Sequence, residues 1–142
     1  MKKILIMLLM IGTLTAQYEV VKEKASVTDD DILIKTISGF SVIEFCAGWA
    51  GVCSIDKFMD VEGYKGAKIF HADTKDTPKE TRKNKLRTFP SVVLYKDGRV
   101  IGRWKATIDG KNAVNSSDIM DKIDNPPPKR RRSTSAKQKS KR

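Results

Sequence analysis

The sequence predicts an α/β fold in which a mixed β-sheet is covered by helices. Apolar runs rich in β-forming residues alternate along the chain with stretches of helical periodicity. Two further apolar runs flank an Asp97-Gly98 pair, which is a strong hairpin signal. The resulting order of strand, helix, strand, helix, hairpin and helix is typical of a single modest domain with one central sheet.

The chain begins this pattern with a helix and a strand. Thr28 and Asp29 are capping residues, and Asp29, Asp30 and Asp31 together suit the positive end of a helix dipole. The stripe expected on one face of this helix consists of Ile32, Leu33, Thr36 and Ile37. "FSVIEF", which follows Gly39, predicts a short strand.

The middle of the chain predicts a helix, a strand and a second helix. "GVCSIDKFMDVEGY" is expected to form an amphipathic helix that ends at Gly63, and its apolar face consists of Val52, Ile55, Phe58 and Met59. "AKIFHADT" alternates Ile69, His71 and Asp73 against Phe70 and Ala72, as a strand does. "TPKETRKNKL", with Pro78 in its first turn, predicts a polar surface helix.

The last elements are a hairpin and a helix. "SVVLYKDGRVIGRWKA" predicts two strands joined at Lys96-Asp97-Gly98, with Trp104 as a packing residue rather than a binding platform. "NSSDIMDKIDN" predicts a short capped helix that stops before three prolines.

Residues 1–16 have the layout of a secretory signal peptide. Lys2 and Lys3 precede an apolar run from Ile4 to Leu14, and small residues follow. The run is shorter than the ~20 residues that cross a bilayer, so we expect a cleaved signal, export to the periplasm or the exterior, and no integral membrane span. An uncleaved, tethered form is the alternative.

Residues 126–142 form a basic tail. This segment contains eight Lys or Arg residues and no Asp or Glu, so it carries most of the formal net charge of +11. Residues 17–125, the expected folded domain, are close to neutral and do not by themselves indicate a nucleic-acid surface. We expect the tail to be disordered. It is either a solvated appendage or a polyanion-binding segment, with Lys129, Arg130, Arg131 and Arg132 as the densest charges.

Two motifs within the domain resemble the thioredoxin family. "VIEFCAGWAGVCSIDKF" is similar to the strand, active-site turn and helix of that family, in which Trp precedes Cys-Gly-Pro-Cys. "TFPSVVLYKDGRVIGRW" is similar to the segment that contains the family's cis-proline and terminal hairpin. The resemblance covers about residues 27–124. It implies a three-layer α/β sandwich with helices on both faces of a mixed central sheet.

The resemblance also implies roles for individual residues. Pro90 matches the cis-proline that shapes the substrate groove, and Phe89 and Trp49 would line the groove beside it. Glu44 matches the buried acid that relays a proton in the family, and Cys53 matches the second active-site cysteine. These positions form the expected site, with Cys53 and Glu44 as its catalytic candidates.

The nucleophile that the family uses is missing. Ala50 stands at the position of the attacking cysteine, and a methyl group cannot open a disulfide. Val52 replaces the family's proline, and Cys46 replaces an aromatic residue. The site is therefore degenerate, and whether the chain is an enzyme stays open.

Two interpretations of Cys46 and Cys53 remain open. In an exported protein an even pair of cysteines is more often bridged than free, so a disulfide is possible. We favour a structural bridge or buried thiols over an unusual redox couple. His71 is the only histidine, and no Cys or second His lies at ligand spacing in the sequence, so we expect no metal site and no cofactor.

The sequence therefore leaves three functional hypotheses. The first is an exported thioredoxin-like monomer of the thiol-disulfide redox class, weakly active or non-catalytic, that binds extended or Cys-containing polypeptide. The second is an interaction protein whose basic tail binds polyanions. The third is an atypical oxidoreductase that uses Cys46 and Cys53.

Overall fold

The computed structural model describes residues 26–48, 55–109 and 114–130 of the 142-residue chain. Outside the described residues lie the expected signal peptide, the segment 49–54 with Trp49, Ala50 and Cys53, and the tail residues Arg131 and Arg132. Within the described part, none of the helices has the length and apolar character needed to span a membrane.

A four-stranded mixed sheet forms the centre of the domain. The strand order is β2-β1-β3-β4, with β1 parallel to β2 and antiparallel to β3, and β3 antiparallel to β4. In chain order the elements are α1 (Asp29–Lys35), β1 (Phe40–Cys46), η1 (Ile55–Val61), η2 (Tyr64–Gly66), β2 (Lys68–Asp73), α2 (Pro78–Lys83), β3 (Ser91–Lys96), β4 (Arg99–Trp104) and α3 (Ser116–Asp124).

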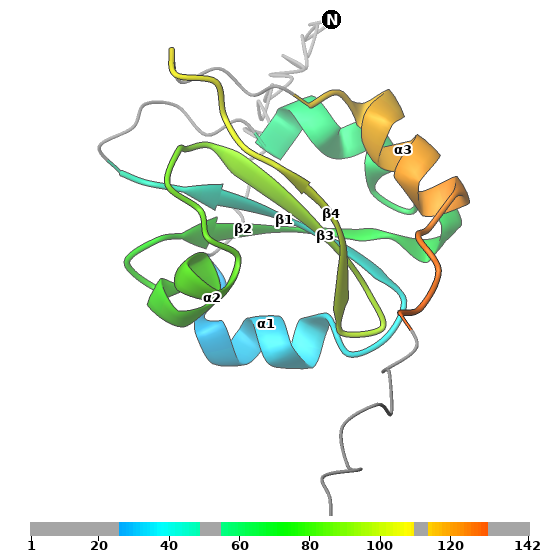
Figure 1. The fold of residues 1–142 in the computed structure, drawn as a ribbon, viewed down its shortest axis with the longest axis horizontal. Helices are drawn as coiled ribbons and strands as arrows, with labels where there is room; N and C mark the ends of the chain where they lie inside the picture. Colours follow the sequence, from blue (N-terminus) through cyan, green and yellow to red (C-terminus); the bar gives the residue numbers. More distant parts are fainter. Residues whose placement is uncertain (1–25, 49–54, 110–113, 131–142) are drawn as a thin grey trace, which may run out of the picture.

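Helices cover both faces of this sheet, so the fold class predicted from the sequence is confirmed. Figure 1 shows α1 and α2 on one side of the strands, and α3 with the 3₁₀ helix η1 on the other. A core cluster lies against each face. One includes Val42, Phe58, Val61, Ile69, Leu94 and Ile119, and the other includes Ile32, Ile43, Phe45, Val93 and Tyr95.

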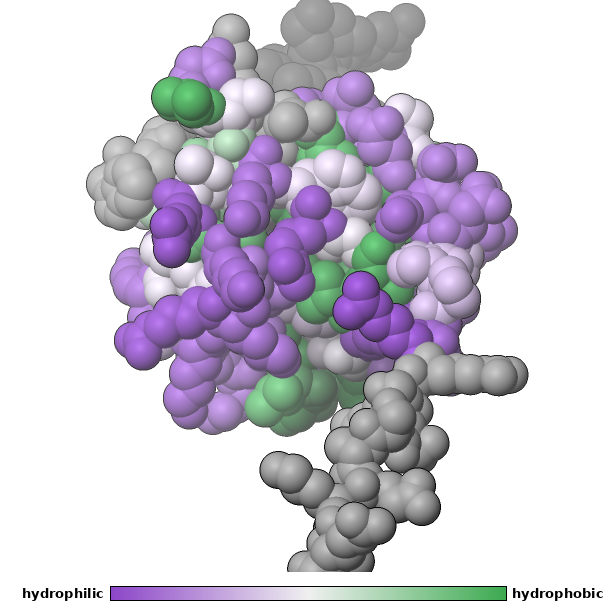
Figure 2. All heavy atoms as spheres, viewed as in Figure 1, coloured by the Kyte–Doolittle hydropathy of each residue, from purple (hydrophilic) through white to green (hydrophobic). Residues whose placement is uncertain are grey.

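The α1 helix buries a narrower face than its sequence pattern suggests. Ile32 and Thr36 are buried as expected, but Leu33 and Ile37 are 59% and 71% exposed. The helix has only seven residues and ends at Lys35, so Ile37 lies beyond it, and Leu33 falls outside the face that the helix buries. Figure 2 shows apolar side chains at the surface near this helix on an otherwise mainly hydrophilic face.

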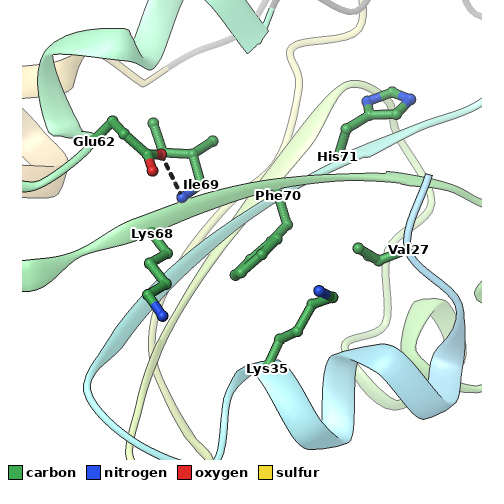
Figure 3. Close-up of a pocket in the computed structure, with 7 residues that line it drawn as sticks. All are labelled: Val27, Lys35, Glu62, Lys68, Ile69, Phe70 and His71. Atoms are coloured by element: carbon green, nitrogen blue, oxygen red, sulfur yellow. Dashed lines mark hydrogen bonds between the residues drawn. The ribbon is translucent and has the colours of Figure 1, made fainter. Parts of the chain in front are cut away.

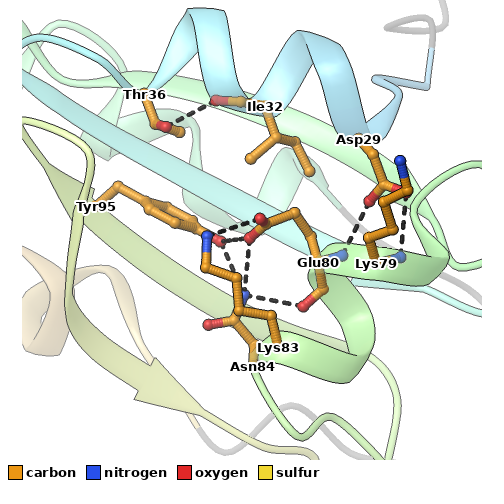
Figure 4. Close-up of polar contacts among 8 residues, drawn as sticks. All are labelled: Asp29, Ile32, Thr36, Lys79, Glu80, Lys83, Asn84 and Tyr95. Carbon is orange, nitrogen blue, oxygen red and sulfur yellow. Dashed lines mark hydrogen bonds and ion pairs between the residues drawn. The ribbon is translucent and has the colours of Figure 1, made fainter.

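The acidic residues at the start of α1 serve two helices. Asp31 completes a capping box with Thr28 on α1 itself. Asp29 instead accepts hydrogen bonds from the backbone N–H groups of Lys79 and Glu80, at 3.1 and 2.9 Å, in the first turn of α2 (Figure 4). Since the Thr77 side chain makes no capping bond, Asp29 supplies an acceptor to α2 from a different helix.

The segment that begins at Ile55 is a 3₁₀ helix, Ile55–Val61, rather than the predicted α-helix. A 3₁₀ helix has three residues per turn, which aligns residues three apart. Phe58 and Val61 are accordingly both fully buried, whereas Met59, expected on the apolar face, is 49% exposed. The predicted stop at Gly63 agrees with its positive φ of 83°.

The hairpin forms as the sequence predicts. Asp97 and Gly98 both have positive φ, at 49° and 76°, which is the conformation that a tight primed turn requires. On β4, Gly102 leaves room for the side chain of Trp104, which packs against the core cluster of the α3 face.

Candidate functional site

The candidate site lies where β1 ends, on the α3 side of the sheet. Side chains alternate along a strand, so Val42, Glu44 and Cys46 share one face of β1. Val42 belongs to the core cluster on the α3 face, which places Glu44 and Cys46 toward that face as well. Glu44 is 1% exposed and Cys46 is 5% exposed, so both lie inside the protein rather than on its surface.

Pro90 approaches the same end of the sheet from β3. Phe45 pairs with Ser91 across the β1–β3 ladder, so the residues that precede Ser91 lie beside the chain as it leaves β1. The Phe89–Pro90 peptide bond is cis, the isomer that the resemblance implies, and both residues are buried. The Ser91 hydroxyl group donates a hydrogen bond of 2.5 Å to the carbonyl oxygen of Thr88, which links the start of β3 to the segment before Pro90.

Cys46 is disulfide-bonded in this structure. The chain has one other cysteine, Cys53, which lies outside the described residues, as do Trp49 and Ala50. Of the expected site residues, Glu44, Cys46 and Pro90 come from neighbouring ends of β1 and β3, whereas the side chain of Phe89 packs into the core cluster on the opposite face of the sheet, beside α1.

His71 lies beside Cys46, which the sequence analysis did not foresee. Its Nδ1 atom is 3.5 Å from Sγ of Cys46, although 25 residues separate them along the chain. Glu44 completes the group, because one donor atom from each of the three residues lies within 4.8 Å of the others. The lack of a Cys at ligand spacing in the sequence was therefore a wrong reason to expect no metal ligands near His71, because Cys46 lies beside His71 in the sheet.

Strand pairing explains this juxtaposition. The parallel β1–β2 register places Glu44 directly opposite His71. Figure 3 shows the alternation along β2, with Ile69 and His71 on one side of the strand and Lys68 and Phe70 on the other. The alternation within each strand predicts which side chains share a face, but only the register between the two strands shows that Glu44 and Cys46 lie next to His71.

A second polar cluster lies on the opposite face of the sheet. α2 was predicted to be a polar surface helix, but its Glu80 is only 4% exposed. Tyr95 donates a hydrogen bond of 3.0 Å to Oε2 of Glu80 and accepts one of 2.9 Å from Asn84 (Figure 4). Burial, reinforced by the nearby Glu80 carboxylate, raises the pKa of Tyr95 well above its ordinary value.

The start of the basic tail contacts the domain. The Arg99 guanidinium group donates hydrogen bonds to the carbonyl oxygens of Pro128 and Pro127, at 3.2 and 3.1 Å. This segment and the hairpin together line a groove of about 990 Å³. Its charged lining consists of Lys96, Asp97, Arg99, Arg103, Lys129 and Arg130.

The relatives and the solved structures that this chain resembles point to the same fold. No protein-family model matches this chain. It is 26% identical over 102 residues to thioredoxin from Staphylococcus aureus, a match that covers 68% of this chain and 93% of that protein. Among solved structures it is similar to Malassezia sympodialis thioredoxin, with a TM-score of 0.51, 19% identity, and coverage of 70% of this chain and 85% of that one. Schistosoma mansoni thioredoxin is similar at a TM-score of 0.51 and 17% identity, over 69% of this chain and 89% of the other.

Proposed function

Because the chain has a thioredoxin-like fold, we propose that it is an exported protein of the thiol-disulfide redox class that binds extended or Cys-containing polypeptide and has little dithiol reductase activity. The observation that carries this proposal is the convergence of the β1 end and Pro90 at one end of the sheet. In a thioredoxin-like fold this corner forms the groove for polypeptide. The groove candidates are Pro90 and, outside the described residues, Trp49. Phe89, the third residue that the resemblance suggests, has its side chain in the core cluster on the α1 face instead.

The low dithiol reductase activity that we propose follows from the alanine at position 50. The mixed-disulfide cycle begins when a thiolate attacks a disulfide sulfur, and alanine has no atom that can do so. Glu44 retains the position of the proton-relay acid in the family and is buried there. Such a protein would bind an extended polypeptide segment in the groove, but it would not exchange a disulfide with that segment at position 50.

Restoring the lost thiol tests this assignment. Ala50→Cys is expected to raise the rate of reduction of a peptide disulfide at least about tenfold over the parent chain, because a thiolate is the attacking species. Ser117→Cys, which adds a thiol on an exposed position of α3, is the matched control and should leave the rate at the parent level. Equal rates for the parent chain and Ala50→Cys would overturn the assignment.

Cys46 and Cys53 are proposed to form a structural bridge. Cys53 is the only other cysteine of the chain, and Cys46 is disulfide-bonded and buried. Buried bridges are resistant to exchange, whereas labile or catalytic ones tend to be strained or exposed. The intact protein should therefore contain no free thiol before denaturation and two after denaturation and reduction. Rapid reduction of the native protein by a small dithiol would favour the atypical oxidoreductase instead.

Export is proposed from residues 1–16 alone. The N-terminal sequence of the protein recovered from its host should begin after Ala16 if the signal peptide is cleaved there. A mature protein that retains Met1 would contradict cleavage and favour the tethered form.

A second candidate function is polyanion binding through the tail. The Arg99 bonds to Pro127 and Pro128 support it, because they place Lys129 and Arg130 beside the cationic side chains of the hairpin. The tail and the domain would then present one basic surface, even though residues 17–125 are nearly neutral in total.

Salt dependence tests this function. Binding of duplex DNA should weaken steeply with salt in the parent chain, and deletion of residues 126–142 should abolish it. Arg99→Ala should weaken binding and lower the salt slope by roughly one, whereas Arg87→Ala, an exposed arginine outside the groove, should change the affinity less. Binding that survives the deletion would exclude the tail as the anion site.

A further inference from the structure

We propose that reduction of the Cys46 disulfide creates a binding site for a zinc-class divalent metal ion, formed by Cys46, His71 and Glu44. These three side chains supply a sulfur, a nitrogen and an oxygen donor, all within 4.8 Å of one another. Zinc and its cobalt substitute accept this mixture of ligands, whereas calcium and magnesium prefer oxygen atoms alone.

The spacing of the two softer donors fits such an ion. The Cys46 Sγ and His71 Nδ1 atoms are 3.5 Å apart. With a Zn–S bond of ~2.3 Å and a Zn–N bond of ~2.0 Å, tetrahedral geometry separates these two ligand atoms by about 3.5 Å. The pair therefore spans one edge of a zinc tetrahedron with little rearrangement.

The surroundings of the three donors also favour a bound cation. Glu44 and Cys46 are buried and His71 is half-buried, so an ion between them would be largely shielded from solvent. Two adjacent strands hold all three side chains, since Glu44 pairs with His71 in the β1–β2 register and Cys46 follows two residues later on the same face. Ligands on paired strands are positioned more precisely than ligands on loops.

The oxidation state of Cys46 would control metal binding at this site. A sulfur atom within a disulfide is a poor metal ligand, and the thiolate is the binding form. Reduction of the bridge by a dithiol adds two electrons and two protons to give two thiols, while the dithiol becomes a disulfide. The metal ion then displaces the proton of the Cys46 thiol and forms the metal–sulfur bond. Metal binding and bridge formation therefore exclude each other at Cys46.

Cobalt(II) binding to the mature chain tests the proposal. Cys53→Ser removes the only possible partner of Cys46 within the chain and so frees the thiol without acting on the three donors. In the presence of a phosphine reductant, this variant should bind one equivalent of cobalt(II) with a thiolate-to-metal charge-transfer band. The oxidised parent chain should show no such band.

Substitutions of the donors make the test specific. In the Cys53→Ser background, His71→Gln should weaken cobalt binding at least about tenfold, and Cys46→Ser should abolish the charge-transfer band. Asp73→Asn is the matched control, because Asp73 pairs with Cys46 across the strands but is not one of the three clustered donors, and it should leave the affinity unchanged. Equal affinities for His71→Gln and the control would overturn the proposal.

A measurement on the unsubstituted chain covers the case in which a variant fails to fold. After reduction of the parent protein, zinc should slow alkylation of Cys46, identified by peptide mapping, relative to the same protein with a chelator. An alkylation rate that zinc does not change would also overturn the site. Neither result depends on peptide-disulfide reduction, so the proposed function is tested separately.

Discussion

The hydroxyl group of Tyr95 donates a hydrogen bond of 3.0 Å to Oε2 of Glu80, which joins β3 to α2 within the protein interior. Asn84 bonds to both groups, and Lys83 reaches Oε1 of Glu80 at 2.8 Å. A charged side chain on a surface helix is thus held inward by partners from the sheet and from its own helix (Figure 4).

Tyr95→Phe should destabilise the protein. The substitution removes the donor to Glu80 and the acceptor for Asn84 while leaving the aromatic ring, so we expect the free energy of unfolding to fall by about 1–3 kcal/mol. Urea denaturation measures this free energy of unfolding. Tyr64→Phe is the matched control, because the Tyr64 hydroxyl group bonds to Asp124 at an exposed position, and its effect should stay within about 0.5 kcal/mol. Equal losses in the two variants would contradict the interior network.

The same tyrosine should make the protein sensitive to alkali. Its pKa is raised above the ordinary value of 10.0 in the folded state, mainly by burial. The unfolded chain releases the Tyr95 proton as the pH passes about 10, while the folded chain still holds it, so the free energy of unfolding should fall from there upward. The fall should be less steep in Tyr95→Phe. Parallel pH profiles of the two proteins, measured by urea denaturation, would refute this source of alkaline sensitivity.

Asp29→Ala should weaken the start of α2 rather than of α1. The carboxylate accepts from Lys79 and Glu80, and its loss leaves two first-turn N–H groups without this acceptor. We expect a destabilisation of about 1 kcal/mol, and a smaller one for Asp29→Asn, which keeps an acceptor oxygen. Asp30→Ala, at the neighbouring exposed position, serves as the control in thermal denaturation. A larger loss for Asp30→Ala would show that the acidic cluster acts mainly through its own helix.

Gly102→Ala should displace the indole ring of Trp104. A Cβ atom at position 102 would lie 2.5 Å from Cη2 of Trp104, closer than van der Waals contact allows. In a Trp49→Phe background, the remaining Trp104 emission should shift to longer wavelength as the ring moves toward solvent, with a loss of about 1–3 kcal/mol in stability. Gly48→Ala, where a Cβ would meet no atom of the described residues within 4 Å, should leave the emission unchanged. Unchanged emission from Gly102→Ala would show that the ring does not need this space.

Local sequence patterns were sufficient for most of the elements. β1, β2 and the hairpin were predictable because alternation and the Asp97-Gly98 turn depend on neighbouring residues. The predicted stop of the helical segment at Gly63 has the same origin, since a positive φ is a property of one residue. The thioredoxin-like fold followed from the order of these elements and from the motifs around Glu44 and Pro90.

Other features depended on how the elements pack together. Whether Leu33 faces the core, and whether Phe58 lies in an α-helix or a 3₁₀ helix, depends on the surface that each helix meets. The capping of α2 by Asp29 joins positions about 50 residues apart, and no local pattern specifies such a contact.

The sequence by itself determined which residues with reactive side chains this protein has, including the absence of a thiol at Ala50. Only the tertiary structure decided which of them meet, and it placed His71 beside Cys46 and Glu44. The physical reason is that backbone preferences act between near neighbours in the chain. Contacts across a parallel sheet are instead fixed by strand register, which depends on burying the apolar residues of both faces at once.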